Sequence, residues 1–200
     1  ITTRSVSRTK KKFNKTKKIK FIKINVLNKL QIKQAINKIK PNFIFYFAGL
    51  SSPNLSFKKP KETYLSNAIG CKNFLEVIYE NNFDCKFLNS SSCEIFAKTN
   101  KLININSNKN PVSPYGRAKL EGHNYTKFFR ERKKINAYNA IFFNTESFLR
   151  KRNYLIPKIC LAAINAKKFK KKTSFGNLNA VREWNWCEEQ LKYLLKFIKK

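Results

Sequence analysis

The sequence predicts an α/β fold, a doubly wound parallel sheet that is incomplete and is followed by the start of a smaller domain. Segments with strand and helix character alternate along all 200 residues, which is typical of parallel strands joined by crossover helices. The apolar run 43–48 lacks alternation, as strands buried on both faces do. Polar clusters follow three predicted strands, where ligands bind in such folds. We expect residues 1–143 to form the sheet domain and 144–200 to begin an interleaved second region.

In the first half, periodicity separates the elements. Residues 19–27 alternate as a strand does, and 28–40 repeat apolar residues at helical spacing before a proline. The buried strand 43–48 leads into a predicted turn over 49–53. Apolar positions then predict one long helix over 62–81.

The second half continues the alternation. We expect the remaining elements in this order: a strand over 86–89 that ends in three serines, an irregular stretch over 97–112, a helix from Pro114 to about 134, a strand over 138–143, a loop over 144–153, a helix over 154–168, a short strand over 173–175 and a helix over 188–198.

The charge is extreme, with 43 Lys and Arg against 11 Asp and Glu and a net charge of +32. One interpretation is an anionic partner such as nucleic acid. The other is a bias in composition, since Lys, Asn, Ile and Phe are all used heavily. Nucleic-acid-binding arms do not carry this much Phe and Ile, so we favour the second interpretation and expect no specific nucleic-acid partner.

Cysteine and histidine usage limits the chemistry. Five scattered cysteines form no CxxC motif, and there is a single histidine, so neither a disulfide framework nor a zinc site is expected. No secretory signal is visible, and the apolar runs are too short to cross a membrane. These features predict a cytoplasmic protein without membrane contact or bound metal.

Tyr115 and Lys119 stand four residues apart, on one face of the predicted helix. An ammonium group close to a phenol stabilises the phenolate, so such a tyrosine can act as a base below its ordinary pKa of about 10. This pairing suits the removal of a proton from an alcohol during hydride transfer. In a chain so rich in lysine the spacing also arises by chance, but a serine at the end of the strand 86–89 would complete the set.

The order and content of five stretches resemble the extended short-chain dehydrogenase/reductases, a Rossmann-type family of epimerases and dehydratases, and within it the GDP-mannose 4,6-dehydratases. The stretches are "PNFIFYFAGLSSPNLSFKKPKET" (41–63), "KFLNSSSCEIF" (86–96), "SPYGRAK" (113–119), "FFNTES" (142–147) and "FGNLNAVREWNW" (175–186). The resemblance implies that residues 1–143 form a partial NADP-binding domain and that 144–200 begin the region that binds the sugar nucleotide.

The resemblance also implies the catalytic residues. Tyr115, helped by Lys119, would take the C4 hydroxyl proton of GDP-mannose as hydride moves to NADP, and Ser92 would support the C4 oxygen. Glu94 would then remove the C5 proton and help water leave C6. The returning hydride would give GDP-4-keto-6-deoxymannose. Because an epimerase or reductase needs only the first three residues, Glu94 separates the dehydratase from these alternatives.

The remaining site residues follow from the same resemblance. Arg4 would lie near the 2′-phosphate of NADP, although it is equally accounted for as one basic residue among many. The implied cofactor-binding residues are Arg4, Asn25, Val26, Phe47, Ala48, Gly49, Ser51, Tyr115, Lys119, Thr145 and Arg150. The implied substrate-binding residues are Ser92, Glu94, Asn144, Lys158, Asn177 and Arg182. An intact member of the family would form a homo-oligomer.

The chain departs from the family where the dinucleotide is held. It has five glycines, none of which form the glycine-rich turn that lets a helix N-terminus approach a pyrophosphate. Asn25 and Thr145 stand where the family has Asp and His. We therefore expect a fragment that starts on the second strand and stops within the substrate domain; an inactive homologue is the alternative.

These departures predict weak cofactor binding. The 200-residue chain should bind NADP only weakly, because the turn that cradles the pyrophosphate is not in the sequence. Isothermal titration calorimetry of the purified chain with NADP measures this directly. Tight binding of one NADP per chain would show that other residues supply the cradle.

Overall fold

The computed structural model describes residues 1–7, 19–152, 154–176, 178–179 and 181–199, and it divides into two compact units, 1–141 and 142–200. Unit 1 contains a three-stranded sheet in the order β3-β4-β5, formed by β3 (Phe43–Tyr46), β4 (Lys86–Ser92) and β5 (Ala137–Phe142). β3 and β4 run parallel, with Phe43 opposite Lys86 and Tyr46 opposite Asn89. The predicted α/β fold with parallel strands is therefore confirmed.

Two further strands form a sheet of their own. β1 (Thr2–Thr3) pairs in parallel with β2 (Ile22–Lys23), which is far shorter than the strand predicted over 19–27. Among the described residues, β3 has one neighbouring strand, β4. In the described part of unit 1, the strands thus form two separate sheets.

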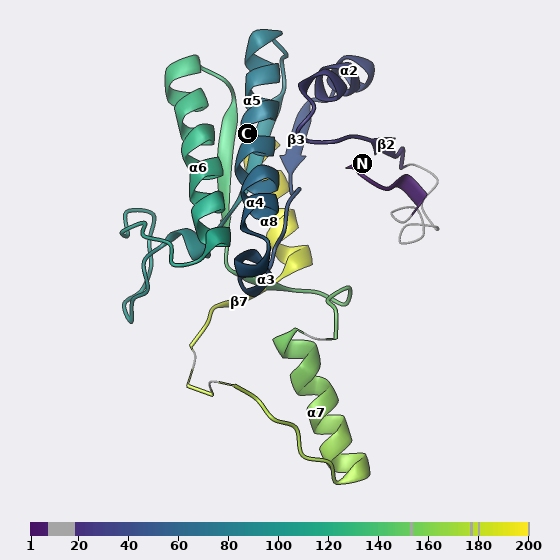
Figure 1. Ribbon diagram of the computed structural model, residues 1–200, viewed down its shortest axis with the longest axis vertical. Coiled ribbons are helices and arrows are strands. Elements are labelled where there is room, and N and C mark those ends of the chain that lie inside the picture. The colour runs from purple at the N-terminus through teal and green to yellow at the C-terminus, as the bar shows by residue number, and fades with distance from the viewer. Residues whose placement is uncertain (8–18, 153, 177, 180, 200) are drawn as a thin grey trace. The chain divides into compact units, whose positions relative to one another are not determined.

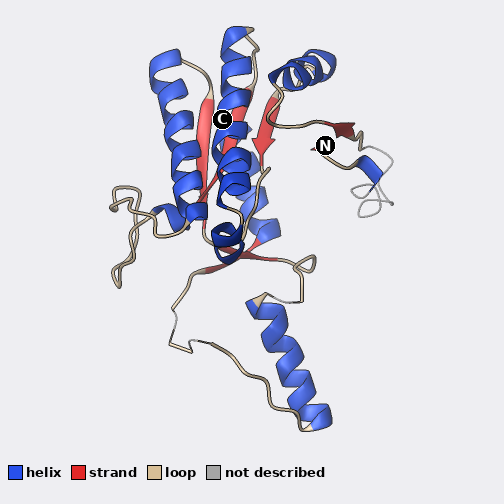
Figure 2. Cartoon of the chain, viewed as in Figure 1, coloured by secondary structure: helices blue, strands red, loops and turns tan. Residues whose placement is uncertain are grey.

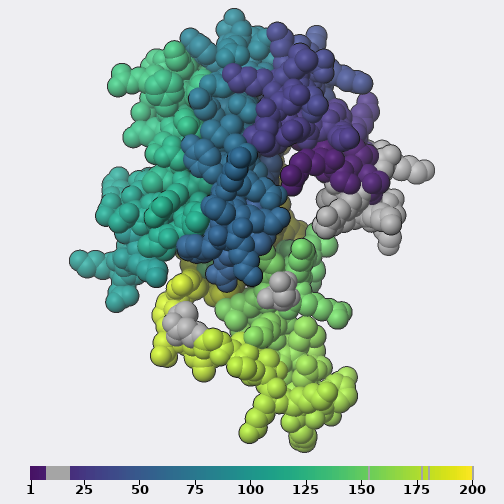
Figure 3. Space-filling model, viewed as in Figure 1, coloured from purple at the N-terminus to yellow at the C-terminus, as the bar shows by residue number. Residues whose placement is uncertain are grey.

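Helices cover the β3-β4-β5 sheet. α5 (Gly70–Glu80) and α6 (Pro114–Lys133) lie side by side against it, and α2 (Lys29–Ile39) packs on α5 (Figures 1 and 2). In the space-filling view, residues of α5 occupy the middle of the visible face of unit 1, with α6 on one side and α2 on the other (Figure 3).

The core of unit 1 is aromatic at its centre. The rings of Tyr46, Phe74 and Phe87 contact one another, with centroids 5.5 to 6.4 Å apart. Phe87 is fully buried, and so are Leu75 and Ile32. These residues come from β3, β4, α2 and α5, so the sheet and its helices share one hydrophobic core.

The long helix predicted over 62–81 is interrupted. It consists of α4 (Pro60–Tyr64), a π-helical turn η1 (Leu65–Ile69) and α5. The Tyr46 hydroxyl donates a hydrogen bond to the Ser66 carbonyl oxygen at 2.6 Å, within that turn. Apolar periodicity could not reveal this π-helical turn, because the residue that bonds it, Tyr46, lies in β3, 20 positions earlier in the chain.

Sequence patterns also misplaced several shorter elements. Residues 90–92 belong to β4 rather than following it, and α3 (Pro53–Lys58) begins where only a turn was expected. The Ser52 side chain caps α3 and a proline opens it, a helix-start signal that the turn prediction overlooked. The stretch 173–175 is not a strand.

The described residues of unit 2 form two short strands and two helices. β6 (Asn144–Glu146), where a loop was expected, pairs in parallel with β7 (Trp184–Trp186). α7 (Leu155–Phe169) and α8 (Cys187–Lys199) agree with the predicted helices within one residue at each end. The assignment of the two regions to cofactor and substrate stays a prediction.

Candidate active site

The N-terminus of α6 is fixed by two serines. Ser113 caps the helix by accepting a hydrogen bond from the Gly116 amide at 3.0 Å, and Pro114 occupies the first turn, where its missing N–H costs nothing. The Tyr115 amide donates to the Ser56 hydroxyl at 3.0 Å. Ser56 lies in α3 and is fully buried, so the start of α6 is tied to α3.

Gly116 brings α6 against the end of β4. A Cβ atom at this position would overlap the Glu94 carbonyl oxygen and crowd the Pro111 side chain. Glycine is therefore required by space rather than by backbone conformation. The 3₁₀ turn η2 (Cys93–Ile95), which carries Glu94, packs on the first turn of α6 beside Tyr115.

Lys119 points into this junction. Its ammonium donates to the carbonyl oxygen of Ser90 at 2.7 Å and to the Ser90 hydroxyl at 3.2 Å. The ammonium also lies 5.8 Å from the centre of the Tyr115 ring, so the predicted Tyr-Lys pair shares one helix face. Burial lowers the pKa of Lys119 to about 8, because removal from water disfavours the charged form.

Ser92 and Glu94 meet this pair from the strand side. Ser92 is buried, and its hydroxyl accepts a hydrogen bond from the Glu94 amide at 3.2 Å. Glu94 is partly exposed. The two segments that carry the four predicted catalytic residues therefore meet at one junction within unit 1, where Gly116 lies against the Glu94 carbonyl and Lys119 bonds Ser90. Ser92 and Glu94 lie more than twenty positions before Tyr115 and Lys119 in the chain.

A network of buried and partly buried hydrogen bonds links the elements of this junction to β5. The Ser91 hydroxyl and His123 Nδ1 are 3.1 Å apart, and the His123 carbonyl accepts from the Asn139 side chain at 3.0 Å. Asn139 in turn accepts from the Asn89 side chain at 2.9 Å. The network links β4, α6 and β5. Burial, together with nearby Lys109, Arg130 and Lys127, lowers the pKa of His123 to about 4, so the ring is neutral at pH 7.

Apart from Tyr115 and Lys119 in α6, the predicted cofactor residues of unit 1 lie outside helices and strands. Gly49 adopts a φ of +131°, and a Cβ there would overlap the Asn67 side chain, so only glycine fits this turn. Phe47 is 51% exposed and Phe45 37%, and Tyr46 is the one buried residue in 43–48, so the prediction of a strand buried on both faces is wrong. The reason is that β3 has only β4 beside it among the described strands. Of the other predicted cofactor residues in these loops, Arg4, Asn25 and Ser51 are exposed, and Val26 and Ala48 are partly buried.

The predicted residues of unit 2 form local contacts. Thr145 donates to the Gln190 side-chain oxygen at 2.7 Å, and Asn144 donates to the Glu183 carbonyl at 3.0 Å. Arg150 lies 3.4 Å from the Glu146 carboxylate and stacks on Tyr154.

The residues of unit 2 that are predicted to bind the substrate differ in their contacts. The Lys158 ammonium bonds the Ser174 carbonyl at 2.8 Å and lies 4.9 Å from the centre of the Phe175 ring. The exposed Arg182 donates to the adjacent Val181 carbonyl. Asn177 lies outside the described residues.

Sequence reasoning missed the residues that fix the segments of the four predicted catalytic residues. Ser113 carried a signal, since a serine before a proline is a typical helix start. Ser56, Ser90 and His123 carried none, because their partners lie 29 to 59 positions away in the chain.

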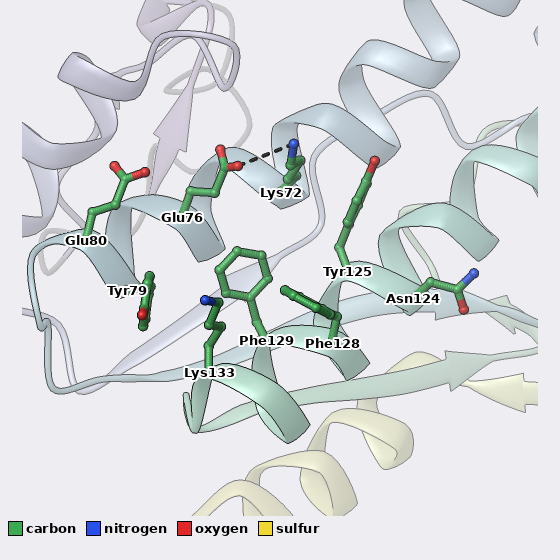
Figure 4. A pocket seen from close by; sticks show the side chains of 9 residues that line it. All are labelled: Lys72, Glu76, Tyr79, Glu80, Asn124, Tyr125, Phe128, Phe129 and Lys133. Atoms are coloured by element: carbon green, nitrogen blue, oxygen red, sulfur yellow. Dashed lines mark ion pairs between the residues drawn. The ribbon is translucent and has the colours of Figure 1, made fainter.

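A groove of about 540 Å³ lies elsewhere on unit 1, between α5 and α6 (Figure 4). Its walls combine aromatic side chains with charged and polar ones, and the Lys133 ammonium stands 4.9 Å from the centre of the Tyr79 ring. The lining residues are Lys72, Glu76, Tyr79, Glu80, Asn124, Tyr125, Phe128, Phe129 and Lys133. None of them is a predicted site residue, so the groove is distinct from the candidate active site.

The part of the chain that the structure describes contains neither a candidate metal centre nor a helix able to span a membrane. No cluster of three His, Cys, Asp or Glu residues occurs among the described residues. In the same part of the chain, every helix is too short or too polar to cross a bilayer.

Solved structures show the same fold. UDP-glucuronic acid 4-epimerase from Bacillus cereus, solved with UDP-glucuronic acid and NAD, superimposes with a TM-score of 0.79 at 16% identity, covering 97% of this chain and 60% of the epimerase. DesIV, a dTDP-glucose 4,6-dehydratase from Streptomyces venezuelae, gives 0.78 at 15% identity over 94% and 57% of the two chains. The fold is thus that of Rossmann-type epimerases and dehydratases.

Sequence comparison defines the family within this fold. A family model for GDP-mannose 4,6 dehydratase matches residues 1–200, and the chain belongs to that family. GDP-mannose 4,6 dehydratase 2 of Arabidopsis thaliana is 31% identical over 161 residues, which are 78% of this chain and 43% of the relative. GDP-mannose 4,6-dehydratase of Sinorhizobium fredii is 30% identical, with coverage of 78% and 46%. The chain thus spans less than half the length of these relatives.

His123 should make stability depend on acid pH. Unfolded histidine has a pKa of about 6.5 and the folded residue one of about 4, so the unfolded state binds the proton first as the pH falls. Stability that is present above pH 6.5 is lost progressively toward pH 4. His123→Asn should lack this loss, and urea unfolding of both proteins at pH 7 and pH 4.5 measures the difference. Equal pH dependence would show that the ring is not held neutral.

Proposed function

We propose that the site belongs to a GDP-mannose 4,6-dehydratase that uses NADP and converts GDP-mannose to GDP-4-keto-6-deoxymannose with loss of water. The observation that carries the proposal is the convergence of Ser92, Glu94, Tyr115 and Lys119 at one junction. Membership of the family and the identity of the curated relatives support it.

The first task of these residues is to oxidise C4 of the hexose. Tyr115 takes the proton of the C4 hydroxyl, and the Lys119 ammonium, held on the same helix face, stabilises the phenolate that does so. Ser92 donates a hydrogen bond to the C4 oxygen. A bound nicotinamide would supply the redox chemistry, as acceptor and then donor of the hydride.

The second task is to eliminate water. A ketone at C4 makes the C5 proton acidic, and Glu94 removes it as a base. The same carboxylic acid then delivers a proton to the C6 hydroxyl, which leaves as water. Glu94 is partly exposed and is therefore accessible to a sugar, whereas Ser92 is buried.

The residues present fit part of the cofactor. In the turn after β3, the positive φ of Gly49 and its contact with Asn67 leave no room for a side chain, and the exposed Phe47 and Ser51 flank it. These residues would hold the cofactor beside Tyr115 and Lys119. Arg4 would bind the 2′-phosphate that distinguishes NADP from NAD, and Asn25 and Val26 would lie near the adenine. The glycine-rich turn for the pyrophosphate is not among the 200 residues.

The family resemblance supports binding roles for residues of unit 2 as well. Asn144, Lys158, Asn177 and Arg182 would bind the GDP-sugar, with Arg182 at the diphosphate, where a guanidinium binds two oxygens at once. Thr145 and Arg150 would bind the cofactor. We further propose that the enzyme acts in the cytoplasm as a homo-oligomer, without a nucleic-acid or membrane partner.

A chimera tests the proposed reaction. The 161-residue segment of the Arabidopsis relative that matches this chain is replaced by the corresponding residues of the chain, so that the relative supplies the remaining parts. The chimera should convert GDP-mannose to the 4-keto-6-deoxy product. Glu94→Gln should reduce turnover by about 10² to 10⁴-fold, the usual contribution of one acid–base group, while binding of NADP is unchanged.

Glu131→Gln is the matched control, because Glu131 is an exposed glutamate on α6 that pairs with Arg130 away from the candidate site, and it should leave turnover unchanged. A chimera that releases a C4 epimer, or a Glu94→Gln variant with full turnover, would contradict the assignment and favour an epimerase of the same fold.

A further inference from the structure

The end of β4 presents three consecutive serines, and each has a different partner. Ser90 bonds the Lys119 ammonium, Ser91 bonds His123, and Ser92 accepts from the Glu94 amide. Lys119 and His123 lie one turn apart on α6, so two adjacent residues of the strand are bonded by two successive turns of the helix. The junction is thereby held in one register.

The Ser90 contact is distinctive because it involves a buried charge. Lys119 is 7% exposed, and its ammonium lies within hydrogen-bond distance of two oxygens of the same residue, the Ser90 carbonyl at 2.7 Å and hydroxyl at 3.2 Å. No carboxylate forms an ion pair with Lys119 among the described residues. An ammonium buried in this way depends on neutral acceptors to remain charged.

We propose that Ser90 is a positioning residue of the active site, whose hydroxyl and carbonyl oxygens hold the Lys119 ammonium on the Tyr115 side of the junction and help keep it protonated. This inference rests on the proposed function, in which a charged Lys119 supports the Tyr115 phenolate. Ser90 and Ser92, both at the end of β4, would then have different roles. Ser90 holds the cation and Ser92 holds the sugar oxygen.

The surroundings of Lys119 make its protonation measurable. Cys71 of α5 also acts on its charge, but burial raises the pKa of that thiol to about 12, so Cys71 stays neutral while Lys119 titrates. Burial alone lowers the pKa of Lys119, and the Ser90 oxygens oppose that effect by bonding the charged form. Loss of the hydroxyl should therefore lower this pKa further.

The test follows the titration of Lys119 by NMR in the full chain labelled with ¹³C in its lysines. The Lys119 signal is assigned by its disappearance in Lys119→Arg. In the unchanged chain it should titrate near pH 8, below the other lysines. Ser90→Ala should shift the midpoint to lower pH by about 1 unit, as expected for one lost hydrogen bond to a charged group. Ser90→Thr, which keeps the hydroxyl, should restore it.

Ser91→Ala is the matched control, since it removes the neighbouring hydroxyl, whose partner is His123 rather than Lys119. It should leave the Lys119 midpoint unchanged. If Ser90→Ala does not fold, Ser90→Cys keeps the side-chain volume with only a weak acceptor and should give a shift in the same direction. An unshifted midpoint in the Ser90 variants, or an equal shift in Ser91→Ala, would overturn the proposal.

The readout needs no catalysis, so the two proposals fail separately. An unshifted midpoint leaves the dehydratase assignment intact, because the chimera is assayed by its product. A chimera without dehydratase activity leaves the bond between Ser90 and Lys119 to be judged by the titration alone.

Discussion

The close approach of α6 to the end of β4 is the constraint on which the candidate site depends. It occurs at Gly116, where the backbone of the helix meets the Glu94 carbonyl with no room for a side chain. On one side of this contact lie Tyr115 and Lys119, and on the other lie Ser92 and Glu94. Without it, the two distant segments that carry a phenol, an ammonium, a hydroxyl and a carboxylate would not meet.

Buried hydrogen bonds stabilise this approach. Ser56 and Ser113 fix the first turn of α6, and Ser90 and Ser91 bond side chains from its next two turns. Buried polar groups are costly unless they are paired, so each serine stabilises one arrangement of strand and helix over the alternatives. Burial, rather than these bonds, lowers the pKa of Lys119 and keeps His123 neutral, because removal from water disfavours the charged form of a basic group.

The sequence predicted the fold and the site to different depths. Alternation and apolar runs located β3, β4, α6 and the two C-terminal helices, because those signals are local. They missed the π turn at 65–69 and the pairing of β6 with β7, which depend on partners far along the chain. The resemblance to a family pointed to the four candidate catalytic residues. Ser56, Ser90 and His123 support their segments through long-range contacts, and no motif in one sequence shows such contacts.

Replacement of Gly116 by alanine tests the central contact most directly. In an unconstrained helix this change would increase stability by up to about 1 kcal/mol, because alanine favours the helix. The account predicts a loss instead, of about 1 to 3 kcal/mol in urea unfolding, because the new Cβ must displace the Glu94 backbone. Gly176→Ala, where a Cβ meets open space, should change stability by less than about 0.5 kcal/mol. A Gly116→Ala protein as stable as the original, or more so, would contradict the account.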